Sequence, residues 1–454
     1  MENPVGENKT LEQLLLELNN PDEKQRAISV LELGKYGAPA IEPLINILRT
    51  DSYYFARRSA VKALDQIGDR RTIPALIEAL KEYGLMSFAG EALFKFGDTS
   101  VIPAMIASLQ DSTGGHHFGL VADVIVQYGE TAVIPLLEAL KQPKPRRWTA
   151  YILGRIEDNR AVAPLFEIAR DKQMTDNERE AAITALGNFP DPQIFELLQQ
   201  LMRDTSETDM VRRFATEALG NFGQASLPYI IEALKDDIIG YNAAVALAKA
   251  DIDGIPAILE ASREKDKKIR AGAVTALGMV GNPTFFNLST APTIEGLPPL
   301  IQALKDPIAD IRKRAINGIW NIISSITITS MLFTEHSNQG QLPSPEIEKK
   351  LKPPNFDRET VLEPVLTALK DESYEVRYSA AMVLGQLGIK DGRVVKALLA
   401  ALSDRDSDVR FRTIEALVQL DVTAPEGEKI FKKLLKDKNH ATSGSAALLL
   451  EKLK

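Results

Sequence analysis

Residues 362–388 read LEPVLTALKDESYEVRYSAAMVLGQLG, and they contain both phrases that recur along the chain. In the first phrase, the apolar residues between Leu362 and Leu369 stand at i, i+3, i+4 and i+7, which is the spacing of one helical face. In the copy of this phrase at 73, IPALIEAL, the proline lies in the first turn, where a missing backbone N–H costs nothing. The second phrase is rich in alanine and is followed by a glycine, a common residue at helix ends. The stretch therefore predicts two helices joined by a short turn.

Both phrases recur with a step of about 30 residues, and this repetition decides the fold class. The first phrase returns as IEPLINIL at 41, IPALIEAL at 73, IPAMIASL at 102, IPLLEALK at 134, LPYIIEAL at 227, IPAILEAS at 255 and LPPLIQAL at 297. The second returns as RRSAVKALDQIG from 57, EREAAITALGNF from 178, VRRFATEALGNFG from 211, IRAGAVTALGMVG from 269 and VRFRTIEALVQL from 409. No long segment alternates apolar and polar residues as a strand does. We expect an all-α protein, an α-solenoid superhelix of about 13 helical hairpins.

Two insertions divide the expected array. Hairpins one to nine occupy residues 1–285, and a short insertion with the tenth hairpin occupies residues 286–325. Residues 326–358 are expected to form a flexible insertion loop, because their prolines and polar residues bury too little apolar surface to offset ordering. Residues 359–454 hold hairpins eleven to thirteen. Repeat proteins often place insertions along a binding face, and an inert insertion is the competing interpretation.

Composition narrows the class of protein further. The 454 residues are 44% hydrophobic but only 6% aromatic, which favours thin repeated layers over thick domains. A formal charge of -8 argues against a protein that coats nucleic acid. The chain has no cysteine, which excludes disulfides, thiolate metal sites and a cysteine nucleophile.

The first residues and the most apolar stretch of the chain indicate where the protein is expected to reside. The start, MENPVGENKT, lacks the basic and apolar regions of a secretory signal, so we expect a cytoplasmic protein without a membrane partner. The most apolar stretch, Ile308–Phe333, is interrupted by Asp310, Arg312, Lys313 and Arg314. We interpret it as a long helix running into a loop rather than as a membrane span.

The repeated units resemble HEAT repeats, and specifically the short kind called phycobilisome-lyase HEAT-like repeats. The signature IPALIEALKD followed by (D/E)xxVRxxAAxALGxxGD is matched closely at Ile73–Lys81, Glu375–Gly388 and Asp408–Leu417. The resemblance covers nearly the whole chain. It implies that one arginine at the start of each second helix reaches an acid of a neighbouring turn and forms a ladder between repeats. These arginines are Arg57, Arg212, Arg270, Arg312, Arg377 and Arg410.

A second set of residues points to binding, because second helices are expected to line the concave face of a solenoid of this type. In the fifth unit, Trp148 and Tyr151 lie one helical turn apart, and Arg155 follows one turn later. Arginine with aromatic residues is the composition that binding hot spots prefer. The candidate partner-binding residues are Arg58, Arg147, Trp148, Tyr151, Arg155, Arg213 and Arg314. A packed tryptophan and a solvated run of charges are the competing interpretations.

Catalytic patterns are absent from the sequence. The four histidines stand at positions 116, 117, 336 and 440, and none is followed by glutamate, which excludes a di-iron enzyme like deoxyhypusine hydroxylase. His116 and His117 could bind an anion at a helix start but are a poor chelating pair, because adjacent residues diverge by about 100°. No GxxxxGK(S/T) or GxSxG occurs. A DNA glycosylase on HEAT-like repeats is disfavoured by the acidic charge. We predict no catalytic, cofactor-binding or metal-binding residue.

Two function hypotheses remain. The first is a non-enzymatic scaffold, adaptor or assembly chaperone that binds another protein, acidic or helical, in the concave groove. The alternative follows from the resemblance: a bilin lyase, or a related chaperone or detachment factor, acting on phycobiliproteins. In that case Arg147, Trp148 and Tyr151 would contact the propionates and rings of a bilin. The scaffold hypothesis involves no cofactor.

Overall fold

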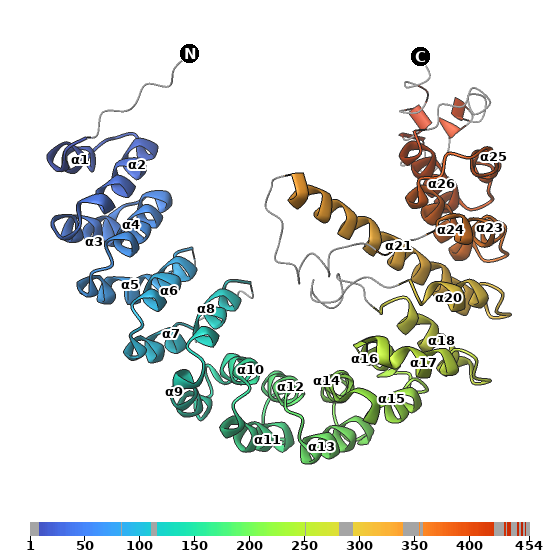
Figure 1. Ribbon diagram of the computed structural model, residues 1–454, viewed down its shortest axis with the longest axis horizontal. Helices are drawn as coiled ribbons and strands as arrows, with labels where there is room; N and C mark the ends of the chain where they lie inside the picture. The colour runs from blue at the N-terminus through green and yellow to red at the C-terminus, as the bar shows by residue number, and fades with distance from the viewer. Residues whose placement is uncertain are drawn as a thin grey trace. The chain divides into compact units, whose positions relative to one another are not determined.

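The chain forms stacked pairs of α-helices. The computed structural model describes residues 9–82, 84–109, 116–249, 251–280, 294–338, 354, 357–421 and several positions between 431 and 450. In 116–118, 251–253 and 332–338, only the backbone is described. These residues form 24 α-helices and contain no strand (Figure 1). The predicted all-α solenoid is therefore confirmed.

The chain divides into two compact units, Met1–Ile194 and Phe195–Lys454. In the first unit, the first helices of the hairpins are α1 (Leu11–Glu17), α3 (Ile41–Thr50), α5 (Ile73–Ala79), α7 (Ile102–Ser108), α9 (Glu130–Leu140) and α11 (Val162–Arg170). The second helices are α2 (Glu23–Leu33), α4 (Tyr54–Ile67), α6 (Met86–Lys95), α8 (His116–Gln127), α10 (Arg146–Ile156) and α12 (Asp176–Leu186). From α3 onward, the first helix of each hairpin in this unit carries the proline phrase.

The second unit repeats this order. Its first helices are α13 (Pro192–Arg203, which begins just before the boundary), α15 (Leu227–Ala233), α17 (Asp251–Ala261), α20 (Leu297–Ala303), α23 (Glu359–Ala368) and α25 (Gly392–Ala401). Its second helices are α14 (Asp209–Leu219), α16 (Gly240–Lys249), α18 (Lys267–Leu277), α21 (Ala309–Asn338), α24 (Tyr374–Leu387) and α26 (Ser407–Gln419). The thirteenth expected hairpin falls after residue 421, where most residues lie outside the described part.

Local sequence signals set the helix ends. The Thr175 side chain accepts from the N–H of Glu178 and completes a capping box at the start of α12. Glycine ends several helices with a positive φ, as predicted, at Gly68, Gly97, Gly129, Gly223 and Gly388. Gly187 also stands at a helix end, as the C-cap residue of α12, but it does so with φ -58 rather than with a positive φ. Gly281 lies outside the described residues.

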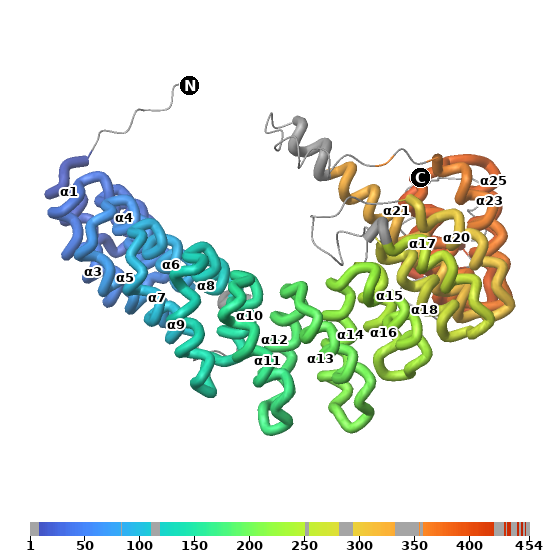
Figure 2. The backbone as a smooth tube through the Cα atoms, turned by 60° about the horizontal axis from the view of Figure 1, so that its bottom comes forward, coloured from blue at the N-terminus to red at the C-terminus, as the bar shows by residue number. Residues whose placement is uncertain are grey.

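Small residues let the second helices approach one another closely. A Cβ added at Gly154 at the end of α10 would lie 2.5 Å from the Cβ of Ala185 in α12, and one at Gly278 after α18 would lie 2.4 Å from the Cα of Gly318 in α21. Consecutive second helices of the same unit pack directly, whereas first helices such as α3 and α5 touch at few points. Within each unit the hairpins stack side by side (Figure 2), and the closely spaced second helices form its shorter, concave layer.

The long helix α21 corrects one prediction. It runs from Ala309 to Asn338, so residues 326–338 are helical although a loop was expected to begin at 326. The hydroxyls of Thr327, Thr329 and Ser330 donate to carbonyls one turn earlier, which lets these polar residues continue a helix. Residues 339–353 of the expected loop lie outside the described part. No helix among the described residues, α21 included, combines the length and apolar character that crossing a bilayer requires.

Candidate partner-binding site

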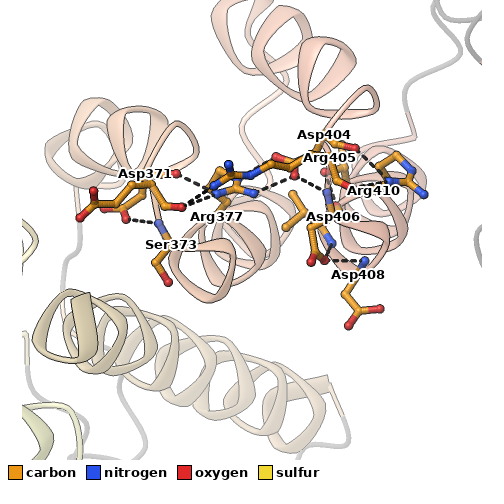
Figure 3. A network of polar contacts seen from close by, with 11 residues as sticks. Asp371, Ser373, Arg377, Asp404, Arg405, Asp406, Asp408 and Arg410 are labelled. Carbon is orange, nitrogen blue, oxygen red and sulfur yellow. Dashed lines mark hydrogen bonds and ion pairs between the residues drawn. The ribbon is translucent and has the colours of Figure 1, made fainter.

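The predicted arginine ladder explains one row of charged residues on the second helices. Figure 3 shows a rung in the second unit, in which Arg377 of α24 donates from Nε and Nη2 to Asp404 at 2.7 and 2.8 Å. Its Nη1 also donates to the carbonyl oxygens of Asp371 and Glu372 at 2.9 and 3.0 Å. Asp404 accepts the N–H of Asp406 at 2.8 Å. Each rung thus joins two hairpins and also orders the turn that leads into the next second helix.

The rungs repeat along both units. Predicted arginines pair with an acid of the next hairpin in Arg57–Glu82, Arg212–Asp236, Arg270–Asp306, Arg312–Asp371 and Arg377–Asp404. Arg410 donates to the carbonyls of Asp404 and Arg405 at 2.9 and 3.3 Å. Sequence reasoning missed two rungs, Arg26–Asp51 and Arg146–Glu178. Arg26 and Arg146 occupy the same position of the repeat as the predicted ladder arginines. The spacing of the repeat could therefore have predicted them.

Electrostatics show that these pairs belong to the fold. Burial raises the pKa of Asp371, but hydrogen bonds from Arg312 and from the N–H of Ser373 lower it by more, so its pKa is below the ordinary value. The same balance holds the pKa of Asp404 low. The Arg312 side chain is only 9% exposed. Because the rung charges are desolvated and mutually satisfied, they offer little to a partner.

The candidate residues of the fifth hairpin gather on the exposed face of α10. The rings of Trp148 and Tyr151 are perpendicular, with centroids 5.9 Å apart. The guanidinium of Arg155 lies 5.7 Å from the centroid of Tyr151. Tyr151 is 39% exposed and Trp148 is partly exposed. These three predicted residues therefore form one continuous aromatic and cationic patch, which we call the α10 patch.

Arg155 of this patch and Arg147 beside it already contact acids of neighbouring second helices. Arg147 pairs with Glu180 of α12 at 3.3 Å. Arg155 pairs with Asp123 of α8, and this hydrogen bond raises its pKa most, while burial lowers it. The rings consequently stand in a locally neutral setting. What the α10 patch offers a partner is mainly aromatic surface, with charge as a secondary contribution.

Arg58 lies on α4, in the same layer of the same unit. Its guanidinium is 4.9 Å from the ring centroid of Phe55 and 5.7 Å from that of Phe88 on α6. Lys62 lies 5.3 Å from the Phe88 ring. Sequence reasoning missed the rings. Phe55 stands three residues before Arg58 and could have been found from helical spacing, whereas Phe88 comes from the next hairpin.

Arg213 and Arg314 belong to the second unit. Arg213 donates to the carbonyl of Ile238 at 3.4 Å. Arg314 pairs with Asp310 at 2.7 Å and donates to the Thr275 hydroxyl at 3.0 Å. Arg314 also lines a surface hollow of about 400 Å³ between α16, α18 and α21. Neither arginine has an aromatic ring stacked on it among the described residues, in contrast to Arg58 and Arg155.

The described part of the chain offers no cluster of metal ligands. No group of three or more His, Asp or Glu side chains there could hold a metal ion. The side chains of His116 and His117, which sequence analysis considered as an anion site, lie outside the described residues, as do those of the other two histidines.

Comparison with known proteins fits this geometry. A family model for HEAT repeats matches residues 9–85, 42–117, 172–248 and 358–454, more than half of the chain. The chain belongs to the HEAT-repeat family. Rungs such as Arg26–Asp51 and Arg377–Asp404 lie inside matched ranges, and Arg270–Asp306 continues the same ladder between them. The narrower resemblance to phycobilisome-lyase repeats stays a prediction.

Several solved structures match the chain at low similarity. An engineered protein is 17% identical over 97% of this chain and 98% of its own, with a TM-score of 0.34. Human deoxyhypusine hydroxylase is 16% identical over 73% of this chain and 98% of its own, with a TM-score of 0.25. A mutant of Kap121p is 12% identical over 96% of this chain and 52% of its own, with a TM-score of 0.40. No curated protein matches the chain. These scores support no inference about the function of this HEAT-repeat protein.

Proposed function

We propose that this HEAT-repeat protein is a non-enzymatic scaffold, adaptor or assembly chaperone that binds another protein on its second-helix layer. The α10 patch carries the proposal. Its Trp148 and Tyr151 rings present apolar surface to solvent. Exposed aromatic side chains held in fixed geometry are typical anchors of protein interfaces. The ladder beside the patch holds the layer rigid, which lowers the ordering cost of binding.

The partner is expected to be a helical or extended protein segment in the cytoplasm. A layer of parallel second helices offers contacts at regular intervals over several hairpins rather than in one deep pocket. On such a surface, two or three anchor residues supply most of the affinity, and the remaining contacts exclude water. Trp148 and Tyr151 are the proposed anchors, and Arg147 and Arg155 are proposed to orient the partner through their exposed guanidinium edges.

Site-specific crosslinking tests this function. A photo-crosslinking amino acid is placed at position 151 of the α10 patch or, as a control, at position 134, an exposed isoleucine of the first helix α9. A specific partner should be captured from position 151 alone. Trp148→Ala should then weaken its binding by about 2 kcal/mol, roughly 30-fold in Kd.

Protein stability separates this proposal from a packing role. Trp148→Ala should leave the free energy of unfolding within about 1 kcal/mol of the parent, because a partly exposed ring supports little of the core. A loss of about 3–5 kcal/mol would show a packed tryptophan and would remove it from the site. Equal capture from positions 134 and 151 would contradict a binding role for this layer.

The second candidate function is that of a bilin lyase or a related chaperone or detachment factor. The feature in its favour is the perpendicular pair Trp148 and Tyr151, with Arg155 beside the tyrosine, as a wall for a tetrapyrrole. A bilin propionate would have to displace Glu180 from Arg147 or Asp123 from Arg155. Mixing the purified protein with phycocyanobilin should give a red-shifted absorbance band under this alternative, and no shift under the scaffold proposal.

A further inference from the structure

A second aromatic and cationic surface lies on α4 and α6 of the first unit, and its cations have no acidic partner in the part of the chain that the structure describes. We call it the α4–α6 cluster: Phe55, Arg58 and Lys62 of α4, and Phe88 of α6. Arg58 is stacked on both phenylalanine rings, at 4.9 and 5.7 Å from their centroids. Lys62 shares the Phe88 ring at 5.3 Å. The cluster thus joins two hairpins through cation–π contacts rather than through a salt bridge.

The exposed ring of the cluster is held in place from below. Phe55 is 45% exposed, yet its ring contacts those of Tyr53 and Tyr54, with centroids 5.4 and 5.2 Å apart. Tyr54 is itself fixed, because its hydroxyl donates to the carbonyl of Gly84 at 2.8 Å. Leaving a large apolar ring in water does not help the chain to fold. A fixed, solvent-facing phenylalanine therefore points to a surface that a partner covers.

Charge decides what kind of partner fits. Among the described residues, Arg58 and Lys62 form no ion pair or side-chain hydrogen bond, whereas other cations of this layer do, as in Lys95–Asp65 and Arg155–Asp123. Two acids lie one turn from the cluster: Glu91 after Phe88 on α6, and Asp65 after Lys62 on α4. Lys95 pairs with Asp65, so Arg58 and Lys62 still outweigh Glu91. A guanidinium stacked by its faces keeps its N–H donors in its own plane, free for a carboxylate.

We propose that the α4–α6 cluster binds an acidic amphipathic segment of a partner protein. A carboxylate of the segment accepts two hydrogen bonds from Arg58 while Lys62 adds a second positive charge. An apolar side chain of the same segment covers Phe55. This inference rests on the proposed function and names the chemistry of its partner. Two cations are too few to follow a phosphate backbone, so the cluster favours a protein segment over nucleic acid.

Peptide display tests the proposal without knowledge of the natural partner. A library of random 16-residue peptides is selected on the full-length protein, and the recovered peptides are measured by fluorescence anisotropy at two salt concentrations. The variants are Arg58→Glu with Lys62→Glu and, as a charge-matched control, Lys81→Glu with Lys141→Glu, which alters exposed residues at the ends of the first helices α5 and α9. A milder variant, Arg58→Gln, covers the case in which the reversal fails to fold.

The recovered peptides should carry Asp or Glu next to apolar residues and should bind more weakly at higher salt. Their affinity should fall at least tenfold in the Arg58→Glu, Lys62→Glu variant and stay unchanged in the control. Recovery of neutral or basic peptides, or equal affinity for both variants, would overturn the proposal. So would a single-stranded oligonucleotide that binds the cluster more tightly than any peptide. Acidic peptides whose binding is lost only in Trp148→Ala would overturn the cluster but leave the α10 patch as the binding site.

Discussion

Adjacent arginines of one helix have different roles in this protein. On α4, Arg57 reaches Glu82 of the next hairpin, whereas Arg58 stacks on exposed phenylalanine rings. On α10, Arg146 is 12% exposed in its pair with Glu178, whereas Arg147 is 55% exposed. Adjacent helical residues point about 100° apart, so one enters the seam between hairpins and the other faces solvent. The row of a residue in the repeat, rather than its type, decides whether it serves the fold or the surface.

Acidification should destabilise the protein most, because it protonates several rung acids together. The folded pKa values of Asp51, Asp236, Asp371 and Asp404 are held below the ordinary value of about 4. Between the folded and unfolded pKa values the unfolded chain binds more protons, so stability rises with pH there. We expect a flat melting temperature from about pH 7 to 5 and a steep fall below about pH 4.

Thermal melts followed by circular dichroism at each pH check this prediction. The same melts at added salt give the comparison for exposed ion pairs. Salt screens these exposed pairs but leaves the partly buried rungs largely intact. A melting temperature that falls as strongly with salt at pH 7 as with acid would mean that surface pairs, rather than the ladder, carry the stability.

Removing one rung should have the next largest effect. Arg312→Ala leaves Asp371 buried without its partner, so we expect a loss of about 3–5 kcal/mol of unfolding free energy in chemical denaturation. Arg393→Ala is the matched control, because Arg393 contacts Asp391, Glu359 and Glu363 but is 51% exposed. The control should change stability little, since exposed pairs contribute little. Similar losses in both variants would contradict the distinction between rung and surface.

The close approach of second helices gives the next prediction. In Gly278→Ala, the new Cβ would lie 2.4 Å from the Cα of Gly318, a backbone atom that cannot rotate away. We expect destabilisation by about 2–3 kcal/mol, measured by urea unfolding. Gly392→Ala is the control, because no heavy atom lies within 4 Å of its added Cβ. A tolerated methyl group at position 278 would show that the layer is more loosely packed than described.

The smallest effect concerns a helix end. Glu157 occupies the left-handed position after α10, with φ 59, where other hairpins place glycine, as at Gly68. Glu157→Gly should stabilise the protein by about 0.5–1 kcal/mol, because glycine adopts this geometry without strain. Glu138→Gly inside α9 should instead destabilise it by about 1 kcal/mol. Loss of stability in both variants would mean that the Glu157 side chain has a structural role.

The sequence predicted what the repeat itself encodes. The hairpins and the ladder arginines recur in register, so periodicity and the HEAT resemblance were sufficient to place them. The partners of the surface arginines were not predictable in this way. Glu180 and Asp123 reach Arg147 and Arg155 from neighbouring hairpins, and their contact depends on the offset between helices. The extension of α21 was missed because Thr and Ser read as loop residues, although their hydroxyls bond to the backbone within the helix.

Contacts within one helix were predictable from the sequence, whereas contacts between hairpins were not. Spacing along one helix brought Trp148, Tyr151 and Arg155 together correctly. The α4–α6 cluster needs Phe88 from another hairpin, so spacing along α4 found only half of it. The sequence did not distinguish two roles of glycine in the second phrase. Gly385 allows close packing against Ala416 of the next second helix, whereas Gly388 ends α24 with a positive φ.

One row of arginines holds the hairpins together, and the adjacent row faces solvent, where we propose that a partner binds. Comparing the thermal unfolding of Arg146→Ala and Arg147→Ala tests it most directly, because the two residues are adjacent on α10. We predict that Arg146→Ala lowers the melting temperature by about 6 °C or more, and that Arg147→Ala shifts it by less than about 2 °C. Equal shifts, or a larger shift for Arg147→Ala, would show that the two arginine rows do not differ in what they contribute to the fold.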